Sequence, residues 1–500
     1  MAREIELKLE VPPAAIRKLG DGLERLADGP VKRERQVSVY FDTRSRALRD
    51  AGLSLRVRRK NGHYVQTVKS GKDATDRLEW ERALSGPAPD RQLARHTALK
   101  PFTGKKTWRQ LRPVFETDVT RASFPVRSGK SRIEVALDQG RVKAGKHKLS
   151  LSEVELELKA GEIADLNRLV SRFAGQAALG LASKAERGYA LADGKNGCHV
   201  KAPSIVLGKD MTAADGLRVI GFSCLHHLAA NREAVLKGDL EGVHQMRVGL
   251  RRLRSALSLF KQLVEGPDLE KIKESLKWMS GELADARNFD VLVRETLVPM
   301  EEKPPTGLDI LERDAKARRD RGLARAQKLV SGPRYRRIVL DTGLWLTGGH
   351  WAVSDDDMKK DLRARDLSDT AREILSERTA KVARKVKKVD RLDDRKRHKL
   401  RIAVKKLRYA AGFFESLFGA SAQKRFEARL KKLQAALGRL NDFRTHAQFA
   451  RKAMRGRTQT KAGTYALGVV RGEEQKDARY CIKAAGKAGS RLRKEPRYWA

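Results

Sequence analysis

Residues 4–10 alternate between charged and aliphatic side chains without a break, in the order Glu-Ile-Glu-Leu-Lys-Leu-Glu. Side chains on a β-strand point alternately to opposite faces, so this segment predicts a strand with one charged and one aliphatic face. The charged face repels itself unless something binds there. Carboxylates two residues apart, such as Glu4 and Glu6, can hold a hard divalent cation. The alternative interpretation is a solvated edge strand of mixed charge, and the rest of the N-terminal third decides between the two.

The same period-two alternation recurs through most of the first 197 residues, in segments joined by short connections. Several short strands with hairpin-length connections favour an antiparallel sheet or barrel. Helical spacing at 14–26 and 163–173 predicts two flanking helices. If the sheet closes, its aliphatic face packs outward and its charged face lines a lumen. Besides residues 4–10, the predicted strands are 36–43, 53–58, 64–69, 78–84, 114–124, 132–138 and 152–159.

A lumen with both signs of charge suits a complex of a divalent cation with a polyphosphate. Carboxylates hold the cation, while arginine and lysine hold the phosphate oxygens. A nucleic-acid groove would need the basic groups but has little use for the glutamates at positions 4, 6, 155 and 157. A P-loop is not predicted, because the Gly-Lys segments at 104–107 and 129–131 lack the glycine five positions earlier.

The 500-residue chain has a formal net charge of +44, which predicts polyanionic partners such as phosphate polymers. Its three cysteines, Cys198, Cys224 and Cys481, lie far apart without metal-ligand spacing, so we expect a reducing compartment and no disulfide framework. The N-terminus lacks an apolar signal core, and no apolar run approaches the ~20 residues that span a bilayer. We therefore expect a cytoplasmic protein with neither a membrane nor a specific nucleic-acid partner.

The N-terminal motifs resemble those of a known family. Glu4-x-Glu6-x-Lys8 is similar to the ExExK signature of the CYTH family, the triphosphate tunnel metalloenzymes. The other motifs follow in the order that this family shows, and the resemblance covers nearly all of residues 1–197. They are Tyr40-Phe-Asp-Thr43, Arg56-x-Arg58, Asp138, Glu155-x-Glu157 and Ser183-Lys184-x-x-Arg187.

The resemblance implies an eight-stranded antiparallel β tunnel and metal-dependent attack on a triphosphate, with Mg²⁺ or Mn²⁺ as the cation. The implied catalytic residues are Glu4, Glu6 and Lys8. Glu153 extends the acidic strand by one step, and we expect it to be a solvated carboxylate at the tunnel mouth. The implied metal ligands are Glu4, Glu6, Asp138, Glu155 and Glu157. The implied triphosphate-binding residues are Lys8, Arg56, Arg58, Lys69, Arg121, Lys184 and Arg187.

The C-terminal half has a helical period and contains a repeat. A turn-rich linker at 193–210 separates it from the first half, which predicts domains at 1–197 and 208–500. The segment 243–254 matches 397–408 at an offset of 154 residues, and the same offset relates 283–289 to 437–443. The predicted fold class is therefore α+β. An N-terminal tunnel precedes an all-α domain of two repeated four-helix bundles, at about 211–350 and 365–500.

Each repeat places a basic stripe on one face of a helix. Four like charges on one face destabilise a helix slightly, and a bound anion would remove that penalty; a solvated basic face is the alternative. The pattern resembles the CHAD family, which is associated with binding inorganic polyphosphate. The match is poor after Arg455. The implied polyphosphate-binding residues are His244, Arg247, Arg251, Arg252 and Arg254 in the first repeat, and His398, Arg401, Lys405, Lys406 and Arg408 in the second.

Three functions agree with these patterns. The first is hydrolysis of inorganic triphosphate to pyrophosphate and phosphate, with polyphosphate binding by the helical domain. The second keeps the tunnel but acts on nucleoside or thiamine triphosphates, or cyclises ATP. The third is a non-enzymatic scaffold that binds polyphosphate or nucleic acid. The complete set of acidic residues in the predicted lumen favours an enzyme over a scaffold, and no aromatic purine pocket is evident.

Overall fold

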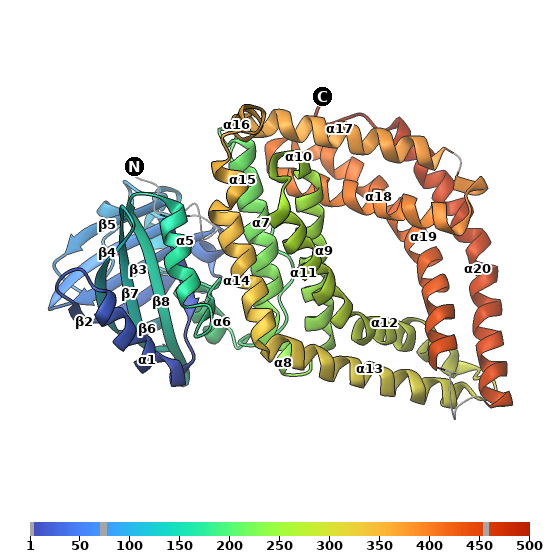
Figure 1. The fold of residues 1–500 in the computed structure, drawn as a ribbon, viewed down its shortest axis with the longest axis horizontal. Coiled ribbons are helices and arrows are strands. Elements are labelled where there is room, and N and C mark those ends of the chain that lie inside the picture. Colours follow the sequence, from blue (N-terminus) through green and yellow to red (C-terminus); the bar gives the residue numbers. More distant parts are fainter. Residues whose placement is uncertain (1–4, 71–77, 388, 454–459) are drawn as a thin grey trace. The chain divides into compact units, whose positions relative to one another are not determined.

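The computed structural model describes residues 5–70, 78–387, 389–453 and 460–500. Two compact units make up the chain (Figure 1). The first unit contains Met1–Cys198 and Gly332–Val353, and the second contains His199–Ser331 and Ser354–Ala500. The first unit therefore takes in a stretch of the C-terminal half in addition to the N-terminal residues.

The first unit is built on one antiparallel sheet with flanking helices, as the sequence predicted. Eight strands correspond to the predicted segments, and the ninth has two residues, too few to show a period in the sequence. The strand order is β5-β4-β3-β2-β6-β7-β8-β1-β9. The strands are β1 Ile5–Glu10, β2 Lys32–Asp42, β3 Leu53–Lys60, β4 His63–Ser70, β5 Leu78–Leu84, β6 Arg112–Ser128, β7 Ser131–Ala144, β8 His147–Ala160 and β9 Ala178–Leu179.

Strand β1 sorts its side chains as the alternation predicted. Leu7 and Leu9 are buried on one face, and Lys8 lies on the other. Residues directly opposite one another in an antiparallel ladder share a face, and Lys8 pairs with Glu155 of β8. The charged face therefore continues from strand to strand. We call it the inner face.

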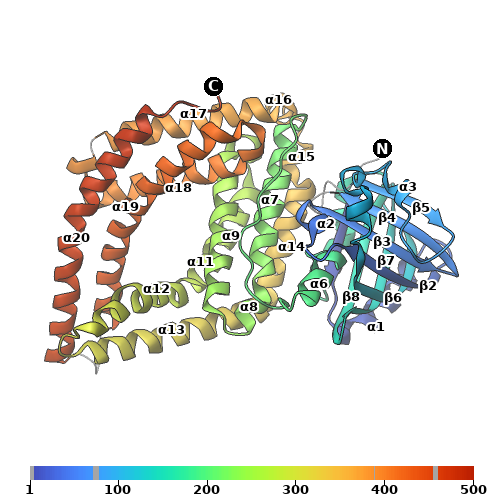
Figure 2. The ribbon, with the colours of Figure 1, turned by 180° about the vertical axis from the view of Figure 1, so that it is seen from behind.

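The sheet curls so that its two ends face each other. Figures 1 and 2 show β3, β4 and β5 as one layer and β6, β7 and β8 as another. Strand β4 lies six places from β1 in the strand order, which would be about 29 Å in a flat sheet. Burial and nearby positive charges, that of Lys8 on β1 among them, nevertheless lower the pKa of Lys69 on β4. The inner face is thus concave and brings distant strands together.

Helices cover both faces of this sheet. Helix α1 (Ile16–Leu26) buries Leu19 and Leu23, and α5 (Ile163–Arg172) packs on β6, β7 and β8. Helix α6 (Lys184–Ala192) packs on the inner face, where it shares a core with residues of β2 and β6. The other helices of this unit are α2 Ala47–Asp50, α3 Arg91–Ala94, α4 Lys105–Trp108, α14 Pro333–Gly348 and α15 His350–Val353, with 3-10 turns at Pro13–Ala15 and Lys100–Phe102.

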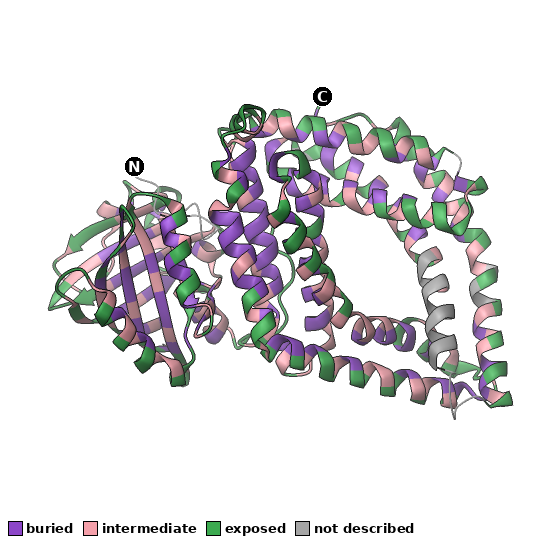
Figure 3. Ribbon diagram, in the orientation of Figure 1, coloured by how far each residue is buried: buried purple, intermediate pink, exposed green. Residues whose placement is uncertain are grey.

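The second unit is helical throughout its described residues. Figure 3 shows α7 as a largely buried helix and α20 as a more exposed one. No helix among the described residues combines the length and apolar character needed to cross a bilayer. The α-helices are α7 Ala213–Ala230, α8 Arg232–Leu236, α9 Leu240–Leu259, α10 Lys261–Val264, α11 Pro267–Glu282, α12 Ala284–Leu292, α13 Leu308–Ser331, α16 Asp357–Ala364, α17 Leu367–Val386, α18 Asp394–Phe413, α19 Ala420–Ala453 and α20 Lys461–Lys494.

The sequence repeat coincides with equivalent helices. Helices α9 and α18 begin and end at the same 154-residue offset. Asp239 and Asp393 cap their N-termini in the same way, each accepting a hydrogen bond from a backbone N–H of the first turn. The two helices meet at Phe260 and Phe414, whose ring centroids lie 6.2 Å apart. The division into two separate four-helix bundles remains a prediction.

Candidate active site on the inner face

Three carboxylates from two strands meet on the inner face. Register places Asp138 of β7 opposite Glu153 of β8, and Glu155 follows two residues later on the same face. One oxygen from each carboxylate lies within 4.8 Å of the others. We call these three residues the central carboxylates.

Two cations from other elements hold the central carboxylates. Lys184, the first residue of α6, places its Nζ 2.7 Å from Asp138 Oδ2 and 2.9 Å from Glu155 Oε1, and it also contacts Glu153. Arg121 of β6 donates to both oxygens of Asp138 at 2.7 Å and to Glu155 at 2.5 Å. Sequence-distant residues therefore converge in one ion-pair network.

The charges in this network stabilise one another. Burial alone would raise the pKa of Glu155, but the surrounding cations hold it well below its usual range. Burial likewise opposes the charged form of Lys184, yet the three carboxylates raise its pKa. Both groups are consequently charged near neutral pH. Lys8 of β1 joins them by placing its Nζ 2.7 Å from Glu155 and 3.1 Å from Glu6.

The expectation for Glu153 is wrong. Its side chain is fully buried rather than solvated, and Arg187 of α6 donates to it at 2.9 Å. The sequence could not show this, because the strand pattern does not reveal which end of β8 is covered by α6. The buried carboxylate helps to position both basic residues of that helix.

A second group of cations lies on β3 and β4. Arg56 is buried, with its Nη2 3.3 Å from Glu79 of β5, and Lys69 places its Nζ 2.5 Å from the same carboxylate. Arg58 differs from both, because in the described structure it makes no ion pair and its buried Nε has no hydrogen-bond partner. Burial and the neighbouring Arg56 lower the pKa of Arg58 to about 10.

A row of glutamates crosses three strands beside the central carboxylates. Glu157 of β8 pairs with Glu6 of β1 on one side and with Glu134 of β7 on the other. Each of the two predicted ligands Glu6 and Glu157 has a lysine neighbour. Lys8 Nζ lies 3.1 Å from Glu6, and Lys159 Nζ lies 2.6 Å from Glu157. The buried Oε1 of Glu6 makes the ion pair with Lys8 but accepts no well-aligned hydrogen bond from the described residues. Glu4, the first residue of the predicted ligand set, lies outside the described residues.

The two carboxylate groups differ in how well they fit a divalent cation. The central carboxylates are the more compact group, but four basic side chains, those of Lys184, Arg121, Lys8 and Arg187, already contact them. The glutamate row has fewer compensating cations, Lys8 beside Glu6 and Lys159 beside Glu157, and carboxylate oxygens are the ligands that Mg²⁺ or Mn²⁺ prefers. On electrostatic grounds, Glu6 and Glu157 fit the cation better than the central carboxylates do.

Helix α6 is anchored at its other end by residues whose role the sequence did not reveal. Asp42, at the end of β2, is fully buried and accepts hydrogen bonds from the Tyr189 hydroxyl at 2.9 Å and from three backbone N–H groups. Arg46 and Arg49 flank the Tyr189 ring and bind Asp193. The Tyr-Phe-Asp-Thr motif at 40–43 was the available signal, but its partner lies 147 residues away.

Packing against the sheet also restricts α6. A Cβ atom at Gly188 would lie 2.1 Å from the ring of Phe115, so only glycine permits this close approach. The Phe115 ring stacks on Tyr40, with ring centroids 4.4 Å apart, and contacts Tyr189 edge-on. The helix that carries Lys184 is thus fixed at both ends.

In the second unit, the basic residues of α9 occupy different environments. His244 is partly buried, and burial and the adjacent arginines lower its pKa to about 4. Arg247 donates to the Ser280 carbonyl at 3.0 Å, and burial and neighbouring arginines lower its pKa to about 10. Arg251 donates to the Tyr409 hydroxyl at 3.4 Å. Arg254 is exposed.

Arg252, which flanks the basic stripe of α9, is not exposed as Arg254 is. It is buried, with its guanidinium over the ring of Phe413, so packing between α9 and α18 accounts for its position. Its repeat equivalent, Lys406, donates to the Ser258 hydroxyl at 2.8 Å. The remaining predicted residues of α18 are His398 and Arg408, which are exposed, and Arg401 and Lys405, which are partly buried.

Two known families match successive parts of the chain. Residues 2–189 match the CYTH domain, and residues 220–451 match the CHAD domain. The chain therefore combines a CYTH domain with a CHAD domain.

Individual relatives each match part of the chain. An inorganic triphosphatase of Haemophilus influenzae is 30% identical over 196 residues, which is 38% of this chain and 55% of the relative. The chain thus spans about half the length of this curated relative. The crystal structure of the CHAD domain from the plant Ricinus communis has a TM-score of 0.51 and 27% identity, covering 60% of this chain and 97% of that one. PptA from Streptomyces chartreusis has a TM-score of 0.40 and 19% identity, covering 56% and 99%.

Proposed function

We propose that the first unit hydrolyses inorganic triphosphate to pyrophosphate and phosphate with the help of Mg²⁺ or Mn²⁺. The observation that carries the proposal is Arg58, a largely buried guanidinium beside Arg56 that lacks an ion-pair partner among the described residues. Adjacent guanidiniums, one paired with Glu79 and the other without a described ion pair, are stabilised by a polyanion. The match to an inorganic triphosphatase over 196 residues supports the same substrate class.

The charges of the inner face indicate how the reaction would proceed. Arg56, Arg58 and Lys69 would neutralise the non-bridging oxygens, which otherwise repel an incoming water molecule. Lys184, held by the central carboxylates, would stabilise charge on the terminal phosphoryl group. Water attacks the terminal phosphorus, the bond to the bridging oxygen breaks, and pyrophosphate leaves. A carboxylate of the inner face is available to accept the proton of the water.

The proposed metal ligands are Glu6 and Glu157, joined by Glu4, with Asp138 and Glu155 nearby. A divalent cation bound there would supply a Lewis acid that neutralises phosphate charge and acidifies bound water. Lys8 lies between the glutamate row and the central carboxylates, where it would hold phosphate and carboxylate together.

The inner face offers little to a base or a thiazole ring. Tyr40 is the aromatic residue paired with Arg56, but it is buried and one face of its ring is covered by Phe115. Base recognition requires an accessible aromatic face or unpaired amide groups. Inorganic triphosphate is therefore favoured over nucleoside or thiamine triphosphates.

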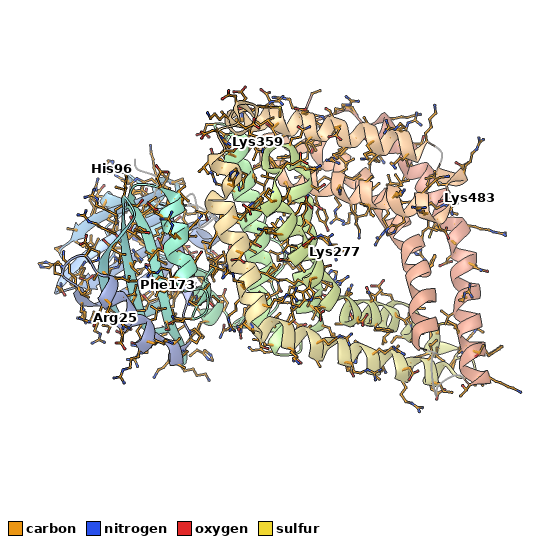
Figure 4. All side chains as sticks on the ribbon, viewed as in Figure 1. Arg25, His96, Phe173, Lys277, Lys359 and Lys483 are labelled. Carbon is orange, nitrogen blue, oxygen red and sulfur yellow. The ribbon has the colours of Figure 1, made fainter. Side chains whose placement is uncertain are left out.

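We further propose that the basic stripes of α9 and α18 bind inorganic polyphosphate. The α9 stripe contains His244, Arg247, Arg251 and Arg254, and the α18 stripe contains His398, Arg401, Lys405 and Arg408. Exposed basic residues are also frequent elsewhere in this unit, as at Lys277 and Lys483 (Figure 4). The high density of positive charge supports binding of a flexible polyanion.

Phosphate release tests the proposed reaction directly. The full-length protein is expected to release phosphate from tripolyphosphate in the presence of Mg²⁺ or Mn²⁺, and chelation with EDTA should abolish release. The rate on tripolyphosphate should exceed the rates on ATP and thiamine triphosphate. The Glu6→Gln variant should lose turnover while unfolding at the same temperature as the wild type. Equal turnover with and without EDTA would contradict the metal requirement.

A further inference from the structure

Glu79 bridges two cations that the proposed function assigns to the triphosphate. Its Oε2 lies 2.5 Å from Lys69 Nζ, and its Oε1 lies 3.3 Å from Arg56 Nη2. These two cations come from adjacent strands, and Lys69 is directly opposite Glu79 in the β4–β5 ladder. One carboxylate thus makes the contacts that two oxygens of a phosphate group would make.

The setting of Glu79 differs from that of the central carboxylates. Asp138 and Glu153 have side chains that are fully buried and contacted by more than one basic residue. Glu79 belongs to β5, which is the terminal strand of the sheet, and its side chain is 21% exposed. A carboxylate at a partly exposed sheet edge can move away from its partners into water at much lower cost than a fully buried one.

The neighbouring Glu81 is a weaker competitor for the same cations. Its Oε1 lies 3.7 Å from Arg56 Nη2, and its side chain is 49% exposed. The Thr67 hydroxyl donates to the same oxygen at 2.9 Å, which gives this carboxylate a different partner. Glu79 and Glu81 therefore differ in their contacts although they carry the same charge on the same face of one strand.

We propose that Glu79 is an internal counter-anion that occupies the phosphate-binding position of Arg56 and Lys69 and is displaced when triphosphate binds. The inference rests on the proposed function, and it assigns to Glu79 the role of setting the affinity for phosphate compounds. Every phosphate compound that uses these two cations must displace Glu79, so the residue weakens binding of substrate and of pyrophosphate alike. Its effect is to keep the product from remaining bound.

The sign of this effect makes the proposal testable. In steady-state hydrolysis of tripolyphosphate by the full chain, Glu79→Gln should lower KM and the inhibition constant of pyrophosphate together. Each should fall by about three- to tenfold, as expected when one partly exposed ion-pair competitor is removed. Glu79→Asp retains the charge and should remain closer to wild type. Glu81→Gln adds the same net charge and should change both constants less.

Several outcomes would overturn the proposal. An unchanged or higher KM in folded Glu79→Gln would show that Glu79 does not compete with phosphate. Equal shifts in Glu79→Gln and Glu81→Gln would show a general effect of charge. Thermal unfolding confirms that each variant is folded, and Glu79→Ala, which also removes the charge, serves if Glu79→Gln is not. Absence of triphosphate hydrolysis by the wild type would instead reject the proposed function, so the two failures are distinguishable.

Discussion

The inner face of the sheet and the basic stripe of α9 both contain several cations, but the charges next to those cations differ in sign. On the inner face, carboxylates lie between the cations, and the pKa of Lys184 is raised despite its burial. On α9, burial and like-charged neighbours lower the pKa of Arg247 to about 10. Neighbouring carboxylates therefore dominate around Lys184, and neighbouring cations dominate around Arg247; Arg58 is the residue of the inner face that follows the second pattern.

This difference separates a site suited to chemistry from one suited to binding. Cations that are ion-paired on several sides are held in fixed positions before a substrate arrives, which is what transition-state stabilisation requires. Cations surrounded by like charge gain most from any polyanion, whatever its length or position. The two regions should therefore respond differently to the same kind of change.

The largest effect is expected for Lys184→Met. The substitution removes the cation that contacts all three central carboxylates, so transition-state charge loses a partner and turnover should fall by at least about 100-fold. The buried carboxylates would also repel one another and lower the stability of the first unit by roughly 3 kcal/mol. Triphosphate hydrolysis and chemical denaturation measure the two effects.

A matched control for Lys184→Met is Lys143→Met. Lys143 also binds two carboxylates of the sheet, Glu116 at 2.9 Å and Asp118 at 3.4 Å, but these residues lie on the opposite face from Arg121. Its substitution should leave turnover within about twofold of wild type because the outer face does not contact substrate. Equal loss of activity in both variants would show that Lys184 of α6 has no special role in turnover.

The next largest effect is expected from salt, which should weaken anion binding more on α9 and α18 than on the inner face. Raising NaCl fourfold should weaken polyphosphate binding more than tenfold if about four phosphate contacts release counterions. The KM for tripolyphosphate should change less, by about threefold or under, because the inner-face cations are shielded from solvent. Titration of labelled polyphosphate and steady-state kinetics at the same salt concentrations provide the comparison. Parallel changes in both quantities would show that the regions bind anions in the same way.

A smaller effect is expected from Tyr189→Phe, which removes one hydrogen bond to Asp42 and leaves the aromatic core. The freed carboxylate keeps its three backbone donors, so stability should fall by about 1 kcal/mol. If α6 shifts, kcat on tripolyphosphate should fall by about three- to tenfold. Tyr64→Phe is the control, since the Tyr64 ring packs in a hydrophobic core on the other face of the sheet. A similar fall in kcat in Tyr64→Phe would show that the hydrogen bond between Tyr189 and Asp42 does not position α6.

The sequence pattern predicted the sheet, its charged face and most of the residues on it, because alternation determines which residues share a face. It did not predict which end of the inner face is covered. Glu153 is buried since α6 lies over it, and Asp42 is buried since Tyr189 reaches it from that same helix. Both contacts depend on tertiary packing between segments that are far apart in the chain.

The repeat in the helical half illustrates the same limit. A constant offset predicted that α9 and α18 are equivalent, and their bounds agree. Helical spacing could not show that Arg252 lies against Phe413, because that contact depends on how the two helices pack. Sequence periodicity gives the face of an element, whereas the partner of that face follows only from the packed structure.

The smallest expected effect concerns His244 and pH. Its pKa is about 4 in the folded protein, below its ordinary value of 6.5, because of burial and the neighbouring arginines. Between these pH values the unfolded chain binds more protons, so the stability present above pH 6.5 declines as pH falls toward 4. Allowing for partial exposure, the contribution is on the order of 1 kcal/mol.

Comparing the two repeats isolates this contribution. Without polyphosphate, His244→Gln should lose less stability between pH 7 and pH 5 than the wild type, because glutamine has no proton to gain. The equivalent substitution His398→Gln, at an exposed position of α18, should follow the wild-type profile. Urea unfolding at both pH values measures the difference. An identical pH dependence in all three proteins would show that the environment of His244 imposes no cost on its protonation, and the contrast drawn between the α9 stripe and the inner face would then rest on Arg247 alone.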